Sequence, residues 1–202
     1  MKKNKKKSRR IIALLILIPV IAAVVFAVYN YANRSLQKTL YPLKYEKYVA
    51  TYCRKYKLEK SFVFAVIKCE SGFQSDAVSS AGAKGLMQIM PDTFTWLKTK
   101  TGEQLPEEKL FDPETSIKYG CLLYSMFIEQ FGSEAEAVAA YHAGPNNVKK
   151  WLCDERFSKD GKTLIDIPFS STKAYVKNVM KTKDIYDKLY LKEPLNKSQH
   201  TL

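Results

Sequence analysis

The chain has 202 residues and a net charge of +13, and 46% of its residues are hydrophobic, which excludes a chain that is disordered throughout. This length accommodates one domain of ordinary size and a short appendage. The charge is uneven, because residues 1–10 hold seven lysines and arginines and no acid. Such segments occur in nucleic-acid-binding arms, but the residues that follow predict another role.

An uninterrupted apolar segment comes directly after the basic one. Ile11 to Val28 contains no charged residue, and as a helix it extends roughly 27 Å, about the thickness of a bilayer hydrocarbon core. We therefore expect a basic cytoplasmic tail at 1–10 and a single-pass membrane helix at 11–29, with the rest of the chain outside the cell membrane. A cleaved signal peptide is the alternative, and it exports the same residues. Neither interpretation leaves a reason to expect nucleic acid as a partner.

The remainder of the chain is predicted to be one folded domain at 43–193. A short polar juncture at 30–42 precedes it, and a polar tail at 194–202 follows it. Apolar residues at steps of three and four predict an amphipathic helix over 43–56. Ser61 is predicted to cap the next helix, which is apolar all round and therefore buried.

Turn-forming residues mark the later elements. Residues 72–85, rich in Gly, Ser and Ala, predict a loop with short strands. Asp112 and Pro113 open a long helix that ends near Gly132. Further signals are a capping box at Ser133 and Glu136, a helix stop at Gly144 and Pro145, and a last helix from about Thr172 to Tyr190. We expect a mainly α or α+β globule with a small Gly-rich loop or strand insertion.

The four cysteines form no C-x-x-C pair, and the chain has only two histidines, so a zinc site is not expected. In an exported protein, four cysteines allow three disulfide pairings, and the sequence does not select one. Buried free thiols are the simpler interpretation, since two of the four lie in apolar helical patterns. The cysteines are Cys53, Cys69, Cys121 and Cys153.

Glu70 is the first candidate for chemistry. It ends a hydrophobic helix, where apolar surroundings and the negative end of the helix dipole both disfavour a charged carboxylate. A carboxyl group that stays protonated near neutral pH can protonate the oxygen of a departing sugar. A glutamate in the last turn of a helix is more often a solvated surface residue, so Glu70 alone does not establish a site.

Three further stretches suit a carbohydrate ligand. Residues 82–91 combine glycines, an amide at Gln88 and two methionines, and so offer close backbone approach, a donor with an acceptor, and apolar contact. Tyr141 and Tyr175 each supply an aromatic hydroxyl. Core packing is the more common explanation for each stretch when it is taken alone.

Taken in chain order, these stretches resemble the soluble-type lytic transglycosylases, peptidoglycan-cleaving relatives of goose-type lysozyme. The resemblance covers roughly residues 45–190, and its most specific part is the GLMQIMP string at its distance behind the Glu-Ser pair. The matching stretches are Glu70-Ser71, residues 85–91 (GLMQIMP), residues 111–114 (FDPE), residues 140–145 (AYHAGP), and residues 167–169 (IPF) with Tyr175 and Val176.

The resemblance implies a lysozyme-like fold with Glu70 as the sole catalytic acid/base, and no metal or organic cofactor. Ser79 matches a position that contacts an N-acetyl group, and Tyr141 matches a tyrosine that faces the acid. The family commonly has Asn at His142 and Glu at Ser171, and these departures bear on the pH profile and on substrate affinity. The implied substrate-binding residues are Ser71, Ser79, Gln88, Met90, Tyr141, His142, Ala143 and Tyr175.

The family's chemistry implies an enzyme that cuts the MurNAc–GlcNAc β-1,4 bond of peptidoglycan strands and leaves 1,6-anhydro-MurNAc ends. With the membrane helix predicted from the sequence, we expect this enzyme to be membrane-anchored. Most glycosidases need two carboxylates, whereas these motifs offer only Glu70, and such a site works if the substrate supplies the second group. Two alternatives remain open: a lysozyme-like hydrolase on the same fold, and a non-catalytic wall-binding module.

Overall fold

The structure, a computed structural model, describes residues 2–191, with side chains from Leu17 to Tyr190. The chain forms two compact units that divide between Pro42 and Leu43. The polar tail predicted at 194–202 lies outside the described residues.

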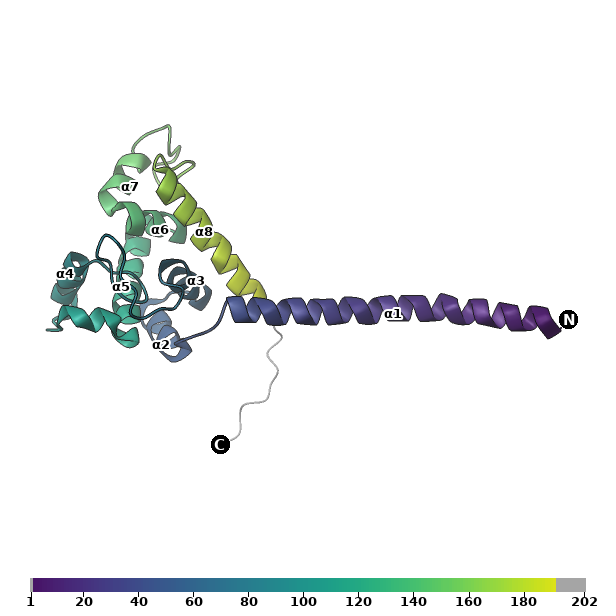
Figure 1. The fold of residues 1–202 in the computed structure, drawn as a ribbon. Helices are drawn as coiled ribbons and strands as arrows, with labels where there is room; N and C mark the ends of the chain where they lie inside the picture. The colour runs from purple at the N-terminus through teal and green to yellow at the C-terminus, as the bar shows by residue number, and fades with distance from the viewer. Residues whose placement is uncertain (1, 192–202) are drawn as a thin grey trace. The chain divides into compact units, whose positions relative to one another are not determined.

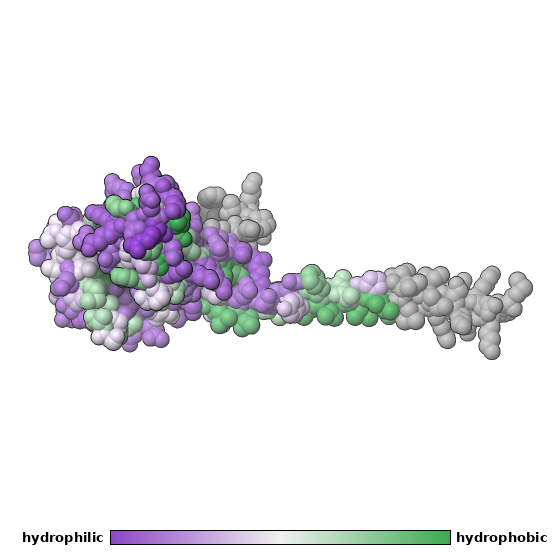
Figure 2. Space-filling model, turned by 90° about the horizontal axis from the view of Figure 1, so that it is seen from above, coloured by the Kyte–Doolittle hydropathy of each residue, from purple (hydrophilic) through white to green (hydrophobic). Residues whose placement is uncertain are grey.

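The first unit is one helix, α1 (Lys2–Leu40). Among the residues whose side chains are described, Leu17–Leu40 is long and apolar enough to cross a membrane. Its mean hydropathy is 1.3, and none of it is buried. Figure 2 shows the hydrophobic residues of this segment in green. The helix extends beyond the predicted span and through most of the predicted juncture, because residues 30–40 contain no glycine or proline to end it.

The second unit is a helical domain, which confirms the predicted fold class (Figure 1). None of its described residues forms a named strand, and the Gly-rich segment contains isolated bridges instead. The elements are α2 (Glu46–Tyr56), α3 (Lys60–Glu70), α4 (Pro91–Thr101), η1 (Glu107–Phe111), α5 (Pro113–Phe131), α6 (Glu134–Ala143), α7 (Pro145–Leu152), α8 (Ser170–Tyr186) and η2 (Asp187–Leu191).

Helix α3 runs through the core and carries the candidate acid at its last residue. Every residue from Ser61 to Ile67 is buried, and the helix packs against α2 and α8. An apolar helix of this kind is stabilised by burial on all sides, at about 25 cal/mol for each Å² of apolar surface removed from water. The core therefore holds the C-terminal end of α3 in place.

The prediction that Ser61 caps α3 was wrong. Helix α3 begins at Lys60 with Glu59 in the capping position, and the Ser61 hydroxyl is buried without a hydrogen-bond partner among the described residues. The first turn of α3 is packed into the core, so the start of this helix is not set by a polar cap.

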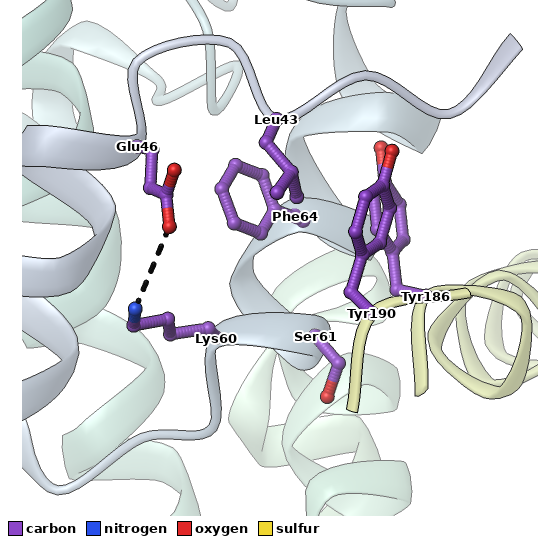
Figure 3. A pocket seen from close by; sticks show the side chains of 7 residues that line it. All are labelled: Leu43, Glu46, Lys60, Ser61, Phe64, Tyr186 and Tyr190. Carbon is purple, nitrogen blue, oxygen red and sulfur yellow. Dashed lines mark ion pairs between the residues drawn. The ribbon is translucent and has the colours of Figure 1, made fainter. Parts of the chain in front are cut away.

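Ser61 also lines a hollow of about 170 Å³ between α2, α3 and the end of α8 (Figure 3). The other lining residues are Leu43, Glu46, Lys60, Phe64, Tyr186 and Tyr190.

Helix α5 begins and ends where the sequence predicts. The Asp112 carboxylate accepts hydrogen bonds from the Thr115 backbone N–H at 2.9 Å and from the Thr115 hydroxyl at 2.7 Å. At the other end, Gly132 closes the helix with a φ of 84°. Ser133 then caps α6 and accepts from the backbone N–H of Glu136, as the capping box predicts.

We expect Asp112→Ala to lower the free energy of unfolding by about 1–2 kcal/mol, because the first turn of α5 loses its cap. Chemical unfolding of the two proteins would measure the difference. Asp92→Ala is the matched control, since Asp92 lies in the first turn of α4 but does not occupy the capping position, which belongs to Met90. Equal losses in the two variants would contradict the capping role.

The Gly-rich segment between α3 and α4 is a compact loop. Lys84 forms antiparallel bridges to Val78 and to Ile89, so the predicted short strands are reduced to these bridges. Gly85 sits at a φ of 76° directly against the Leu110 carbonyl, and a Cβ atom there would lie 1.9 Å from that oxygen. The loop is therefore held tightly on η1.

The two C-terminal helices differ in part from the prediction. Helix α6 stops at Gly144 as expected, but Pro145 then begins α7, a helix that was not predicted. Helix α8 starts at Ser170 and continues after Tyr186 as a wider π-helical turn. Lys183 of α8 pairs with Glu59 at 2.7 Å and with Glu134 at 3.1 Å, and so joins α8 to the starts of α3 and α6.

Candidate active site

Glu70 is half-buried at the end of α3, and its environment changes its acidity. Burial raises the pKa of this carboxyl to about 7, while a hydrogen bond from Tyr175 acts in the opposite direction. No charged side chain among the described residues contributes to this shift. Glu70 is therefore protonated in a large share of molecules at neutral pH, as a general acid must be.

Tyr175 connects Glu70 to helix α8. Its hydroxyl donates a hydrogen bond to Oε1 of Glu70, and α3 and α8 pack along one another. The hydroxyl of Tyr124, from α5, lies 3.4 Å from the hydroxyl of Tyr175. Burial raises the pKa of both tyrosines well above the usual value, so both hydroxyls keep their protons.

A third tyrosine completes a layer beside the acid. The ring of Tyr141, from α6, stacks on that of Tyr124, with centroids 4.5 Å apart and planes 7° apart. The Tyr141 hydroxyl donates to the backbone carbonyl of Met87 and so joins α6 to the Gly-rich loop. We call Tyr124, Tyr141 and Tyr175 the tyrosine layer.

His142 adds an imidazole to this group, at the position where the family commonly has Asn. Its ring stacks on Tyr175 with centroids 4.8 Å apart, and its Nδ1 lies 3.0 Å from the Thr172 hydroxyl. Partial burial lowers the pKa of His142, so the ring is neutral at pH 7. The other departure, Ser171, is exposed.

Two of the predicted substrate-binding residues hold the local backbone. The Ser71 hydroxyl donates to the Leu86 carbonyl at 2.8 Å and so ties the end of α3 to the Gly-rich loop. The side-chain nitrogen of Gln88 donates to the carbonyls of Ala77 at 3.1 Å and Gly85 at 3.0 Å. Gln88 has a φ of 49°, an uncommon conformation for a residue with a side chain.

Three other predicted residues lie outside the bonded group around Glu70. The Ser79 hydroxyl accepts from the Ala83 backbone N–H at 3.0 Å, within the Gly-rich loop. Met90 precedes α4 and is 40% exposed, which leaves its thioether open to a ligand. Ala143 ends α6, and its carbonyl accepts from Asn147 at 2.7 Å.

Sequence reasoning missed Tyr124 and Thr172, which position Tyr175 and His142. Tyr124 lies in the apolar stretch of α5, where nothing distinguishes it from a core aromatic. Thr172 lies in the first turn of α8, and in the sequence only its hydroxyl indicated a polar role. Both connect to the site across long sequence separations, 51 and 30 residues, which no local pattern records.

We expect Tyr175→Phe to move the descending limb of the pH–rate profile to higher pH. The hydroxyl stabilises the charged carboxylate, so its loss raises the pKa of Glu70 and keeps the acid protonated over a wider range. Rates measured between pH 5 and 9 would test this. Tyr52→Phe is the matched control, because it removes a tyrosine–carboxylate hydrogen bond of 3.0 Å to Glu114 instead; a like shift there would contradict the assignment.

Two other features are separate from this group. The hollow shown in Figure 3 shares no residue with Glu70 and the tyrosine layer. Among the residues that the structure describes, no group of three His, Cys, Asp or Glu side chains is placed to hold a metal ion.

A helical domain with one half-buried carboxyl beside a tyrosine layer places this protein in the class of lysozyme-like folds. The chain belongs to the transglycosylase SLT domain family, whose pattern it matches over residues 47–164. It is 36% identical to the soluble lytic murein transglycosylase of Salmonella typhimurium over 156 residues. The aligned region covers 74% of this chain and 23% of that protein.

A solved structure and a second relative agree with this membership. An inactive mutant of the lytic transglycosylase Slt of Pseudomonas aeruginosa has a TM-score of 0.66 and 34% identity, over 73% of this chain and 24% of that one. The membrane-bound lytic murein transglycosylase C of Serratia proteamaculans is 26% identical, over 79% of this chain and 44% of that protein. The chain thus spans about a quarter of the length of the soluble relatives.

Proposed function

We propose that this protein is a membrane-anchored lytic transglycosylase that cuts the MurNAc–GlcNAc β-1,4 bond of peptidoglycan and leaves 1,6-anhydro-MurNAc ends. The observation that carries the proposal is the state of Glu70: a carboxyl with a pKa raised to about 7 by burial, with Tyr175 hydrogen-bonded to it. Membership of the transglycosylase SLT domain family supports the same reaction.

The proposed first step is proton transfer. Glu70 gives its proton to the glycosidic oxygen while the bond from that oxygen to C1 of the MurNAc residue breaks. The acetamido oxygen at C2 of the same sugar stabilises the positive charge that develops at C1, which replaces the second carboxylate of other glycosidases. The Tyr175 hydroxyl then stabilises the Glu70 carboxylate that the step leaves behind.

The proposed second step closes a ring within the sugar. The Glu70 carboxylate takes the proton from the C6 hydroxyl, and the oxygen forms a bond to C1 without the participation of water. Because the hydroxyl and C1 belong to one sugar, their proximity lowers the activation barrier. The reduction reaches about 7–11 kcal/mol in the best-oriented intramolecular reactions. Glu70 is protonated again and ready for the next cycle.

Product analysis tests this proposal. Purified peptidoglycan incubated with the protein should yield muropeptides that are lighter than hydrolysis products by the mass of one water, about 18 mass units. The difference arises because the ring closes without adding water. Mass spectrometry distinguishes the two directly. Reducing ends would instead indicate a lysozyme-like hydrolase, and an unchanged substrate would indicate a wall-binding module.

The membrane anchor is the second part of the proposal. The apolar segment Leu17–Leu40 supports it, and the basic residues before it favour an N-terminus in the cytoplasm and a catalytic domain that faces the wall. The full chain should stay in the membrane after an alkaline carbonate wash, whereas a variant that starts at Leu43 should be released. Protease added outside intact protoplasts should digest the domain; protection of the domain would reverse the orientation.

A further inference from the structure

Two of the four cysteines meet in the core of the second unit. Cys53 of α2 is 4% exposed and Cys121 of α5 is fully buried. The two helices pack along one another, and in the structure both residues are free thiols. Cys53 lies near enough to Cys121 to contribute to the raised pKa of the Cys121 thiol, so the two are neighbours in this interface. Of the three pairings that four cysteines allow, the structure therefore presents one.

The other two cysteines have different surroundings. Cys69 contacts the Thr182 hydroxyl at 3.7 Å and accepts from the Asn178 amide at 3.3 Å, both on α8. Cys153 follows α7 and is exposed. Neither contacts the pair formed by Cys53 and Cys121.

We propose that Cys53 and Cys121 form a disulfide that joins α2 to α5 in the mature protein. The inference rests on the exported location given under the proposed function, because disulfides persist in oxidising compartments and not in the cytoplasm. The thiols are buried neighbours on two helices that pack together, and bond formation requires their sulfur atoms to close to about 2 Å.

The chemistry is thiol–disulfide exchange with a disulfide oxidant, either a small molecule or an oxidoreductase. Two S–H bonds of the chain and the S–S bond of the oxidant break, and one S–S bond forms between Cys53 and Cys121. The oxidant takes up two electrons and two protons and leaves as two thiols. Because Cys121 is fully buried in the folded domain, the exchange takes place during folding, before α2 covers α5.

The position of the bond connects it to the candidate site. Cys121 is close enough to Tyr141 to contribute to the raised pKa of that tyrosine, and Tyr141 belongs to the tyrosine layer beside Glu70. The disulfide would close a loop of about 70 residues that contains Glu70 and the whole Gly-rich segment. Loop closure of this length removes much entropy from the unfolded chain.

Peptide mapping tests the inference directly. The full chain is extracted from membranes without reductant, free thiols are blocked with N-ethylmaleimide in denaturant, and the protein is digested with trypsin. We expect the peptide 48–54 joined to the peptide 119–149, with separation after reduction, and blocked thiols in the peptides 69–84 and 151–156. Recovery of both Cys53 and Cys121 as blocked thiols, or of another pairing, would overturn the inference.

Stability gives a second, independent measurement. Reductant should lower the Tm of the wild-type protein by about 10 °C, and Cys53→Ala should remove this sensitivity while Cys153→Ser keeps it. A Tm that does not respond to reductant would also overturn the inference. Glycan cleavage is assayed on the same preparation, so an active protein with two free thiols refutes only the disulfide, and a linked but inactive protein refutes only the proposed function.

Discussion

Glu70→Gln is expected to lower the rate of glycan cleavage by about 1,000-fold or more, because both proposed proton transfers use this carboxyl. Gln keeps the size of the side chain and can still accept from the Tyr175 hydroxyl, but its amide cannot give up a proton as an acid. The half-buried position remains filled, so the domain should stay folded and should still bind glycan strands.

The measurement combines turnover with binding. Release of soluble muropeptides gives the rate, and co-sedimentation with insoluble peptidoglycan gives the affinity. Glu129→Gln is the matched control, since Glu129 is exposed near the end of α5 and outside the site. If Glu70→Gln retained a rate within tenfold of the wild type, Glu70 would not be the acid.

Gly85→Ala is expected to destabilise the domain by about 3–5 kcal/mol or to prevent its folding. The φ of 76° already disfavours a side chain, and the new Cβ would lie 1.9 Å from the Leu110 carbonyl oxygen. That oxygen belongs to the backbone of η1, so no side chain can rotate to relieve the contact. The Gly-rich loop would have to move away from η1, and with it the Met87 carbonyl to which Tyr141 donates.

Gly82→Ala separates the two causes of this loss. Gly82 has a comparable φ of 88°, but a Cβ atom there would meet nothing within 4 Å. We expect a loss of about 1 kcal/mol, from backbone strain alone. Denaturant unfolding of the two variants gives the difference. Equal losses would show that the close approach to Leu110 does not matter for stability.

Local signals in the sequence were enough to predict much of the fold. The start and end of α5 depend on Asp112, Pro113 and Gly132, which act within one turn of the helix, and all three lie where expected. Glu70 could be singled out as a candidate because its motif is local and its helix is apolar. The loop after it was recognised from its glycines.

The failures share a physical cause, which is that the deciding contacts are remote in the chain. Ser61 was assigned a capping role from its residue type, but the core around α3 determines where that helix begins. Tyr124 was missed because its neighbours at the site come from α6 and α8. The proximity of Cys53 to Cys121 likewise depends on how α2 packs on α5, which no spacing in the sequence reveals.

The hydrogen bond between Tyr175 and Glu70 joins two parts of the chain that are synthesised at different times. The acid lies early in the domain, whereas its hydroxyl partner is 105 residues later, on α8. During synthesis the ribosome completes the Glu70 segment long before α8 emerges, so a nascent or prematurely terminated chain carries the acid without its partner. Because α8 also packs along α3, the proposed site is complete only after translation of the whole domain has finished.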